Sequence, residues 1–255
     1  TREVSSAESH LRDMPVDHPW LRPYQRDAII AIEQAILAGK RAMLVAMATG
    51  TGKTLTTIDL IYRLMKSGTA RRILFLVDRR ALAAQAVTAF ANFEAEPGLK
   101  FDRIYEVYSQ RFRPEDLEDE KFDPKVLPTS YLTNPDLSHA FVYVSTIQRM
   151  RINLFGAPDD TPWVEDVEAE LDASRLDIPI HAFDLIIADE CHRGYTTSEE
   201  SKWREVLDHF DGIKVGLTAT PAAHTTAYFK DIVYHYEYER AVREGYLVDY
   251  DPIVV

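Results

Sequence analysis

Two glycines, a lysine and a threonine stand close together in the segment "MATGTGKT", Met47 to Thr54. Glycines at this spacing let the backbone curl so that successive N–H groups point at an anion. Lys53 could then reach the β- and γ-phosphates of a nucleotide, and the Thr54 hydroxyl could coordinate Mg²⁺. The strict pattern has glycine where Met47 stands, and the alternative interpretation is a glycine turn between a strand and a helix. The predicted nucleotide-binding residues here are Thr49, Gly50, Thr51, Gly52, Lys53 and Thr54.

A second segment, "FDLIIADECHRGY", ends an apolar run in two adjacent carboxylates, Asp189 and Glu190. Two like charges at the end of a buried strand repel each other and lose hydration, and a divalent cation would remove that repulsion. We therefore expect Asp189 to hold Mg²⁺ and Glu190 to polarise an attacking water, which makes Glu190 and Lys53 the predicted catalytic pair. Cys191, which follows directly, is interpreted as a packing residue.

The elements that must position these segments alternate between strands and helices. Helices are predicted at 21–39, 55–68 and 78–93, and strands at 41–47, 71–77, 102–109, 140–146, 183–189 and 213–220. Such alternation predicts an α/β fold with a mostly parallel sheet and helices on both faces. Ligands sit at the carboxyl ends of the strands in such sheets, so the two segments should meet there. Residues 1–19 are polar and are predicted to be a linker from an upstream region.

The net charge of −12 is concentrated in two segments. Residues 113–138 hold three basic and seven acidic residues (−4), and residues 156–184 hold one basic and nine acidic residues (−8). We expect acidic surface insertions at about 113–138 and 156–182, and a neutral remainder that could still form a basic groove. The single cysteine and the absence of a signal peptide or long apolar run predict a cytoplasmic protein with no membrane partner. Thr1 in place of Met suggests a processed chain or a fragment.

Several motifs occur in the order found in superfamily 2 helicases and translocases. "ATGTGKT", "DECH" and "LTATP" resemble motifs I, II and III, and "LRPYQRDAI" resembles the glutamine motif, in which Gln25 would read the adenine edge. The longer phrases "VYVSTIQRMRINLFG", "DLIIADECHRGY" and "AVREGYLVDYDP" resemble the motor (R) subunit of type I restriction enzymes. The resemblance covers about residues 20–250.

This resemblance implies the first RecA-like P-loop NTPase domain of such a motor, over residues 20–237. It implies ATP and Mg²⁺ as cofactors, ATP hydrolysis coupled to translocation on double-stranded DNA, and methyltransferase and specificity subunits as partners. Residues 238–255 would lead to a second RecA-like domain in cis. That domain would supply an arginine finger, because no Gln-x-x-Gly-Arg-x-x-Arg segment exists in this sequence.

Further roles follow from the matched motifs. Thr218 and Thr220 would hydrogen-bond toward His192 and the acidic pair, and so would couple the nucleotide to the DNA site. Arg79, Arg80 and Thr146 follow strands and would contact DNA phosphates, although the arginines could simply be solvated. The acid-x-Lys segment at 119–121 is interpreted as a solvated loop, and Trp203 and Phe210 as core residues.

Two other functions remain open at this point. One is a strand-separating DNA or RNA helicase of the DEAD/DEAH type, which would share all the short motifs. The other is a nucleotide-binding scaffold with little hydrolysis in isolation, for which the missing arginine finger argues.

Overall fold

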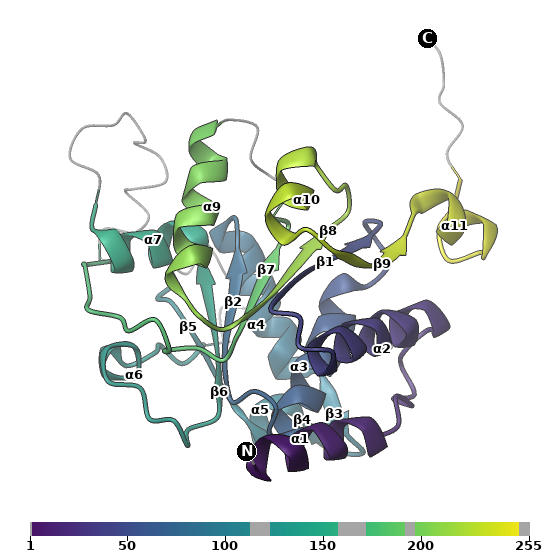
Figure 1. Ribbon diagram of the computed structural model, residues 1–255, viewed down its shortest axis with the longest axis horizontal. Helices are drawn as coiled ribbons and strands as arrows, with labels where there is room; N and C mark the ends of the chain where they lie inside the picture. Colours follow the sequence, from purple (N-terminus) through teal and green to yellow (C-terminus); the bar gives the residue numbers. More distant parts are fainter. Residues whose placement is uncertain (1, 113–122, 158–171, 192–196, 250–255) are drawn as a thin grey trace.

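The computed structural model describes residues 2–112, 123–157, 172–191 and 197–249 (Figure 1). The helices are α1 (Arg2–Asp13), α2 (Pro23–Leu37), α3 (Lys53–Ser67), α4 (Arg80–Asn92), α5 (Phe101–Ile104), α6 (Thr129–Thr133), α7 (Ile147–Phe155), α9 (Thr197–His209), α10 (Ala223–Phe229) and α11 (Tyr238–Arg243). The strands are β1 (Ala42–Met47), β2 (Arg72–Val77), β3 (Glu94–Glu96), β4 (Leu99–Lys100), β5 (Glu106–Ser109), β6 (Phe141–Thr146), β7 (Leu185–Asp189), β8 (Ile213–Thr218) and β9 (Ile232–Tyr236). None of the described helices is long and apolar enough to cross a membrane.

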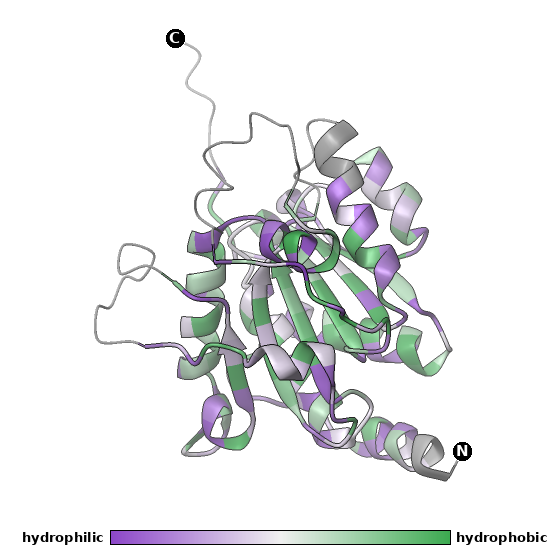
Figure 2. Ribbon diagram, turned by 90° about the vertical axis from the view of Figure 1, so that its left-hand side faces the viewer, coloured by the Kyte–Doolittle hydropathy of each residue, from purple (hydrophilic) through white to green (hydrophobic). Residues whose placement is uncertain are grey.

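Within the described residues, seven strands form one sheet in the order β5-β6-β2-β7-β8-β1-β9, and every neighbouring pair is parallel. Helices cover both faces (Figure 1). Buried side chains of α2, α3 and α4 pack on one face, and those of α7, α9 and α10 pack on the other. Figure 2 shows the consequence in hydropathy, since the strands are predominantly hydrophobic between helices of mixed character. The predicted α/β fold with helices on both faces is confirmed.

Two local predictions differ from the structure, and one is confirmed. The segment predicted as one strand at 102–109 begins as helix α5, and only Glu106–Ser109 enters the sheet. The edge strand β9 was not predicted, because an edge strand with a half-exposed face lacks a continuous apolar run. The core assignment of Trp203 and Phe210 is confirmed, since they are 6% and 1% exposed.

The amino-terminal segment is more than the predicted linker, because residues 2–13 form helix α1. Leu11 on this helix is buried in the first hydrophobic core. The buried Arg63 side chain of α3 donates to the Met14 carbonyl at 2.9 Å and to the Pro15 carbonyl at 2.6 Å. The same guanidinium pairs with Glu33 of α2 at 2.6 Å. The segment is therefore fastened to the domain, although its composition is polar.

The described parts of the two acidic segments are also only partly surface insertions. Leu127 and Leu132 pack in the second core, and so do Ile178 and Phe183. Within the described residues, parts of both predicted insertions therefore belong to the core rather than to the surface. The acid-x-Lys segment at 119–121 lies outside the described residues.

Asp59 on α3 supplies a prediction about pH and stability. Its side chain is 2% exposed, its Oδ2 atom has no hydrogen-bond partner among the described residues, and burial raises its pKa to about 6. A carboxyl whose pKa is higher in the folded state than in the unfolded state favours folding most at low pH, and that contribution is lost as pH rises through 6. We expect Asp59→Asn to raise the free energy of unfolding by about 2 kcal/mol at pH 8 and by much less at pH 4.

Urea unfolding of the two proteins at both pH values checks this expectation. Asp13→Asn is the matched control, because Asp13 is exposed at the end of α1. An equal change in unfolding free energy at pH 4 and pH 8 would contradict the raised pKa of Asp59.

Candidate nucleotide-binding site

The phosphate-binding loop joins β1 to α3 at the carboxyl end of the sheet. Gly50 and Gly52 have φ values of +81° and +77°, a left-handed conformation that glycine adopts without strain. The Thr51 side chain is buried, and its hydroxyl donates to the Ala48 carbonyl at 2.6 Å. Thr49 is exposed, Lys53 begins α3, and Thr54 follows in its first turn. The free N–H groups and the dipole of a 15-residue helix therefore face the loop, as phosphate binding requires.

Gln25 holds this loop from the side. Its Nε2 donates to the Thr51 carbonyl at 2.9 Å, and its Oε1 accepts from the Arg22 backbone N–H at 2.8 Å. A Cβ atom at position 52 would lie 2.5 Å from Gln25 Nε2, so the close approach requires Gly52. Gln25 is only 3% exposed, and its observed contact is with the loop. Its amide keeps one N–H and one lone pair, so adenine reading stays a prediction.

The acidic pair lies at the end of β7, on the same edge of the sheet: Asp189 is the last residue of the strand and Glu190 follows it. Asp189 is half-buried, and its Oδ1 accepts from the Glu190 backbone N–H at 3.0 Å. Glu190 has φ +54°, which is uncommon for a residue other than glycine. Its Oε1 lies 3.2 Å from Lys53 Nζ, in an ion pair of which the two side chains are 17% and 9% exposed. Lys53 Nζ also donates to the Met47 carbonyl at 3.3 Å. The two predicted catalytic side chains are therefore in contact.

The two predicted Mg²⁺ ligands, Thr54 and Asp189, offer a hydroxyl and a carboxylate, which are the oxygen donors that Mg²⁺ prefers. Among the described residues no three His, Cys, Asp or Glu side chains cluster into a metal site. The donor set fits an ion that takes its remaining ligands from phosphates and water. Lys53 and Glu190 cancel each other's charge, so the negative charge of bound phosphates would leave the site in need of a further cation.

Thr218 ends β8, the strand between β7 and β1. It is fully buried, and its hydroxyl donates to the Thr220 carbonyl at 3.0 Å and accepts from the Thr220 N–H at 3.2 Å. The two threonines thus form a turn between the two halves of the site. Their predicted hydrogen bonds toward the acidic pair stay a prediction, and His192 lies outside the described residues.

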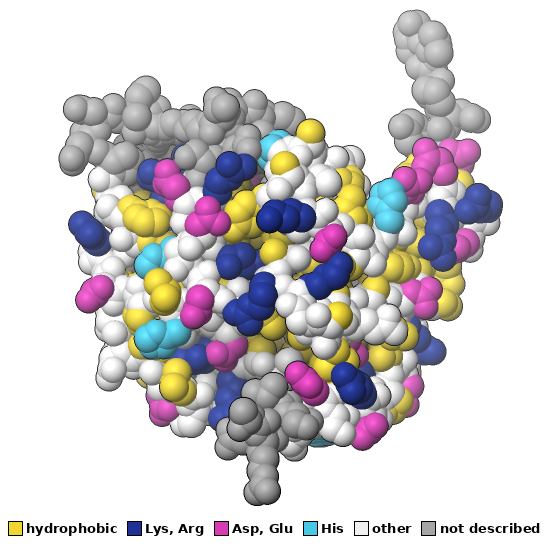
Figure 3. All heavy atoms as spheres, viewed as in Figure 1, with side chains coloured by type: hydrophobic (Ala, Val, Ile, Leu, Met, Phe, Trp, Pro, Cys, Tyr) yellow, Lys and Arg dark blue, Asp and Glu magenta, His cyan; other side chains and the backbone are white. Residues whose placement is uncertain are grey.

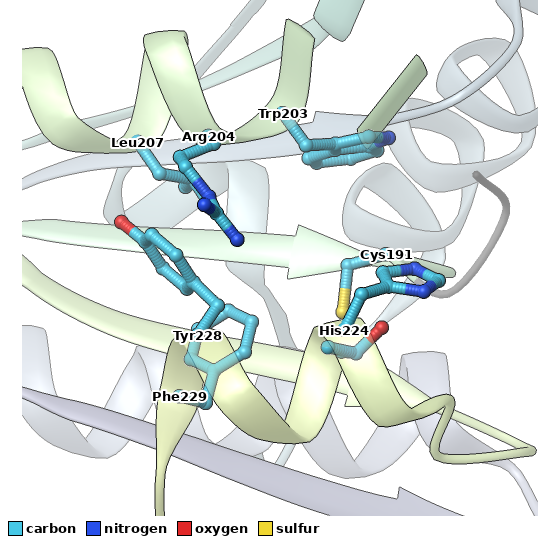
Figure 4. A pocket seen from close by; sticks show the side chains of 8 residues that line it. Cys191, Trp203, Arg204, Leu207, His224, Tyr228 and Phe229 are labelled. Atoms are coloured by element: carbon cyan, nitrogen blue, oxygen red, sulfur yellow. The ribbon is translucent and has the colours of Figure 1, made fainter. Parts of the chain in front are cut away.

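Cys191 packs away from the nucleotide side, against a small cavity of about 30 Å³ between α9 and α10 (Figure 4). Its backbone N–H donates to the Leu217 carbonyl at 3.3 Å, which fastens the end of β7 to β8. Burial, together with the Asp189 carboxylate, raises the pKa of the Cys191 thiol. A buried, protonated thiol is a poor nucleophile, and the packing interpretation is confirmed.

The three predicted DNA contacts differ in exposure. The Arg79 side chain is 71% exposed, with Nε 3.4 Å from Asp78 Oδ2. Arg80 donates to the Arg111 carbonyl at 2.9 Å. Both arginines begin α4 after β2, where a phosphate contact stays a prediction.

Thr146 is only 2% exposed, and its predicted contact with a DNA phosphate stays a prediction. Its hydroxyl caps α7 by accepting from the Arg149 N–H at 3.2 Å, and it donates to Gln110 Oε1 at 3.1 Å. The hydroxyl is therefore used inside the fold, where it positions α7. No local sequence signal pointed to Gln110, which comes from the end of a neighbouring strand.

The fold and this site together define the chain as a RecA-like P-loop domain of the helicase type. A phosphate-binding loop follows β1, an acidic pair lies at the end of β7, and a threonine turn lies at the end of β8 between them. The chain belongs to the family described as the res subunit of type III restriction enzymes, whose model matches residues 19–223. Use of a nucleotide and a divalent metal is general in this helicase-like ATPase family.

Two curated relatives are endonuclease subunits of type I restriction enzymes. The chain is 36% identical over 249 residues to the EcoKI endonuclease subunit of Escherichia coli strain K12, covering 91% of this chain and 18% of that protein. It is 32% identical over 249 residues to the EcoAI endonuclease subunit of Escherichia coli, covering 92% of this chain and 24% of that protein. The chain thus spans a quarter or less of the length of these relatives. The predicted resemblance to the type I R subunit is confirmed.

Solved structures agree on the fold. The ATP-dependent Type ISP restriction-modification enzyme LlaBIII, solved bound to DNA, matches with a TM-score of 0.60 at 19% identity, over 94% of this chain and 17% of that one. A fragment described as the HsdR subunit of a type I restriction enzyme from Vibrio vulnificus YJ016 matches with a TM-score of 0.53 at 22% identity, over 96% of this chain and 35% of that one.

Proposed function

We propose that this chain is the ATP-binding motor domain of an ATP-dependent double-stranded DNA translocase, within the R subunit of a type I restriction endonuclease. The observation that carries the proposal is the 3.2 Å contact between Lys53 and Glu190, which joins the phosphate-binding loop to the acidic pair. The similarity to endonuclease subunits of type I restriction enzymes supports the assignment of this chain to such an enzyme. The activity proposed for the complete protein is ATP hydrolysis.

The geometry supports a sequence of events at the P-loop. Phosphates would be held by the N–H groups of the loop and of the first turn of α3. Lys53 would exchange its Glu190 partner for phosphate oxygens, because a charge-assisted contact with a phosphate replaces one with a carboxylate. The freed Glu190 carboxylate would then accept a proton from the attacking water. Mg²⁺, held by Thr54 and Asp189, would neutralise phosphate charge when it is bound.

Double-stranded DNA is the proposed track, and Arg79 and Arg80 are the proposed contacts with its phosphates. On the face shown in Figure 3, basic and acidic side chains are interspersed rather than gathered into one basic stripe. We therefore infer that this domain supplies only part of the DNA groove. A second RecA-like domain in cis would supply the rest, and methyltransferase and specificity subunits would complete the complex in the cytoplasm.

ATP hydrolysis by the complete protein tests the function. We expect duplex DNA to stimulate its ATPase and single-stranded DNA to leave it near the basal rate, because a translocase follows an intact duplex. A steady-state ATPase assay with matched duplex and single strands measures this. Stimulation by single strands alone would instead support the strand-separating helicase.

Lys53→Ala is the control that ties this assay to the P-loop. The substitution should abolish stimulation and weaken ADP binding by about 1.5–3 kcal/mol, since it removes a charge-assisted contact with phosphate. Calorimetry measures the binding, with Lys40→Ala as the matched variant, because Lys40 pairs with Asp231 at the surface. Equal ADP affinity in Lys53→Ala and the unmodified protein would exclude the assigned role of Lys53.

A further inference from the structure

The chain folds back over the P-loop after helix α11. Strand β9 runs beside β1, and the Ala48 N–H donates to the Tyr236 carbonyl at 3.0 Å, so α11 begins next to the loop (Figure 1). Gly245, with φ +77°, reverses the chain. The backbone N–H groups of Tyr246 and Leu247 then both donate to the Ala241 carbonyl, at 2.8 and 3.2 Å. This turn has a defined conformation, and Ala241 beneath it is fully buried.

Leu247 lies next to the P-loop at Gly50. A Cβ atom at position 50 would lie 3.2 Å from Leu247 Cδ2, which is closer than ordinary van der Waals contact. The leucine side chain therefore lies beside Gly50, and a side chain larger than glycine at position 50 would crowd it. The next side chain, Val248, is 89% exposed and takes no part in this contact.

Tyr246 reaches the same loop through a second route. Its ring makes an edge contact with Tyr24 at 4.9 Å, and the Arg22 guanidinium lies 5.1 Å from its centre. The Tyr24 hydroxyl donates to the Thr51 carbonyl at 2.9 Å. The turn is therefore close to two P-loop residues: Leu247 lies beside Gly50, and Tyr246 is linked to Thr51 through Tyr24.

We propose that Leu247 is a positioning residue for nucleotide binding, which holds Gly50 of the P-loop and links it to the chain that continues beyond Asp249. The proposal rests on the proposed function, because it requires that the P-loop bind nucleotide. Linkage makes the effect reciprocal. A nucleotide that fixes the loop stabilises the turn, and displacement of the turn by the following chain loosens the loop and weakens nucleotide binding.

Nucleotide affinity of the complete protein is the first test, with ADP and Mg²⁺ as the probe in calorimetry. We expect Leu247→Ala to weaken ADP binding about five- to tenfold, because it removes the packing on Gly50. Leu247→Met keeps a side chain of similar volume and should restore affinity to within about twofold. Val248→Ala is the matched control, since it truncates the neighbouring, exposed side chain and should leave affinity unchanged.

Hydrogen exchange is the second test, and one arm of it needs no variant. ADP should slow amide exchange at residues 241–249 of the unmodified protein, and Leu247→Ala should speed exchange at residues 48–54 while Val248→Ala does not. Absence of ADP protection at 241–249, or identical affinity and exchange in the alanine variants at 247 and 248, would overturn the proposal. Loss of ADP binding in Lys53→Ala with no effect of Leu247→Ala would overturn this inference alone, whereas unchanged binding in Lys53→Ala would overturn the proposed function.

Discussion

The isolated 255-residue chain is expected to hydrolyse ATP about 10³- to 10⁵-fold more slowly than the complete protein, with or without duplex DNA. In the proposed motor, the P-loop and the acidic pair would bind and orient the reactants, but charge that develops on the transferred phosphoryl group needs a further cation. In the proposed motor that cation is an arginine of a second RecA-like domain. The sequence contains no segment of the type Gln-x-x-Gly-Arg-x-x-Arg that would carry it.

A steady-state ATPase assay of the chain and of the complete protein measures this difference. ADP binding by both is the control, because the phosphate-binding loop lies within the chain and should bind ADP in either context. Brisk DNA-stimulated hydrolysis by the 255 residues alone would show that the full catalytic set lies within them.

Glu190→Gln in the complete protein is expected to lower ATP turnover by about 10²-fold or more, as loss of a positioned general base does. Its effect on binding should be the opposite of that of Lys53→Ala. Glu190 forms an ion pair with Lys53 at 3.2 Å, and removing the charge of Glu190 would leave the Lys53 ammonium available to phosphate. ADP affinity should therefore be retained or increased.

Single-turnover hydrolysis and calorimetry separate these two effects. Glu205→Gln is the matched control, since it makes the same chemical change in a surface ion pair between Glu205 of α9 and Arg151 of α7. Turnover near the unmodified rate in Glu190→Gln would mean that another group orients the water.

The sequence predicted the parts of the fold that depend on local patterns. Continuous apolar runs gave β1, β2, β6, β7 and β8, since strands buried on both faces leave little room for polar residues. The P-loop and the acidic pair were predicted because their chemistry depends on adjacent residues. Parallel strands then place Lys53 and Glu190 at one edge, although the ion pair between them could not be read from their distant positions in the chain.

Other features could not be predicted, because they depend on contacts between distant segments. Helix α1 is polar. It is held to the domain by the buried Leu11 and by hydrogen bonds that Arg63 donates to the backbone carbonyls just after the helix. Thr146 carried the residue type of a phosphate contact, but Gln110 from another strand takes up its hydroxyl. The contact between Leu247 and Gly50 has no signal in either segment alone.

The order of the strands fixes the distance between the two halves of the candidate site. Asp189 of β7 and Val45 of β1 both pair with Leu217 of β8. The strands β7 and β1, which carry the two halves of the site, are therefore held about 9–10 Å apart by backbone hydrogen bonds to β8. That width cannot open or close without breaking backbone hydrogen bonds. In the proposed motor, the movement of DNA would therefore come from the loops beyond the strand ends or from a second domain, while the sheet keeps the two halves of the site at a fixed distance.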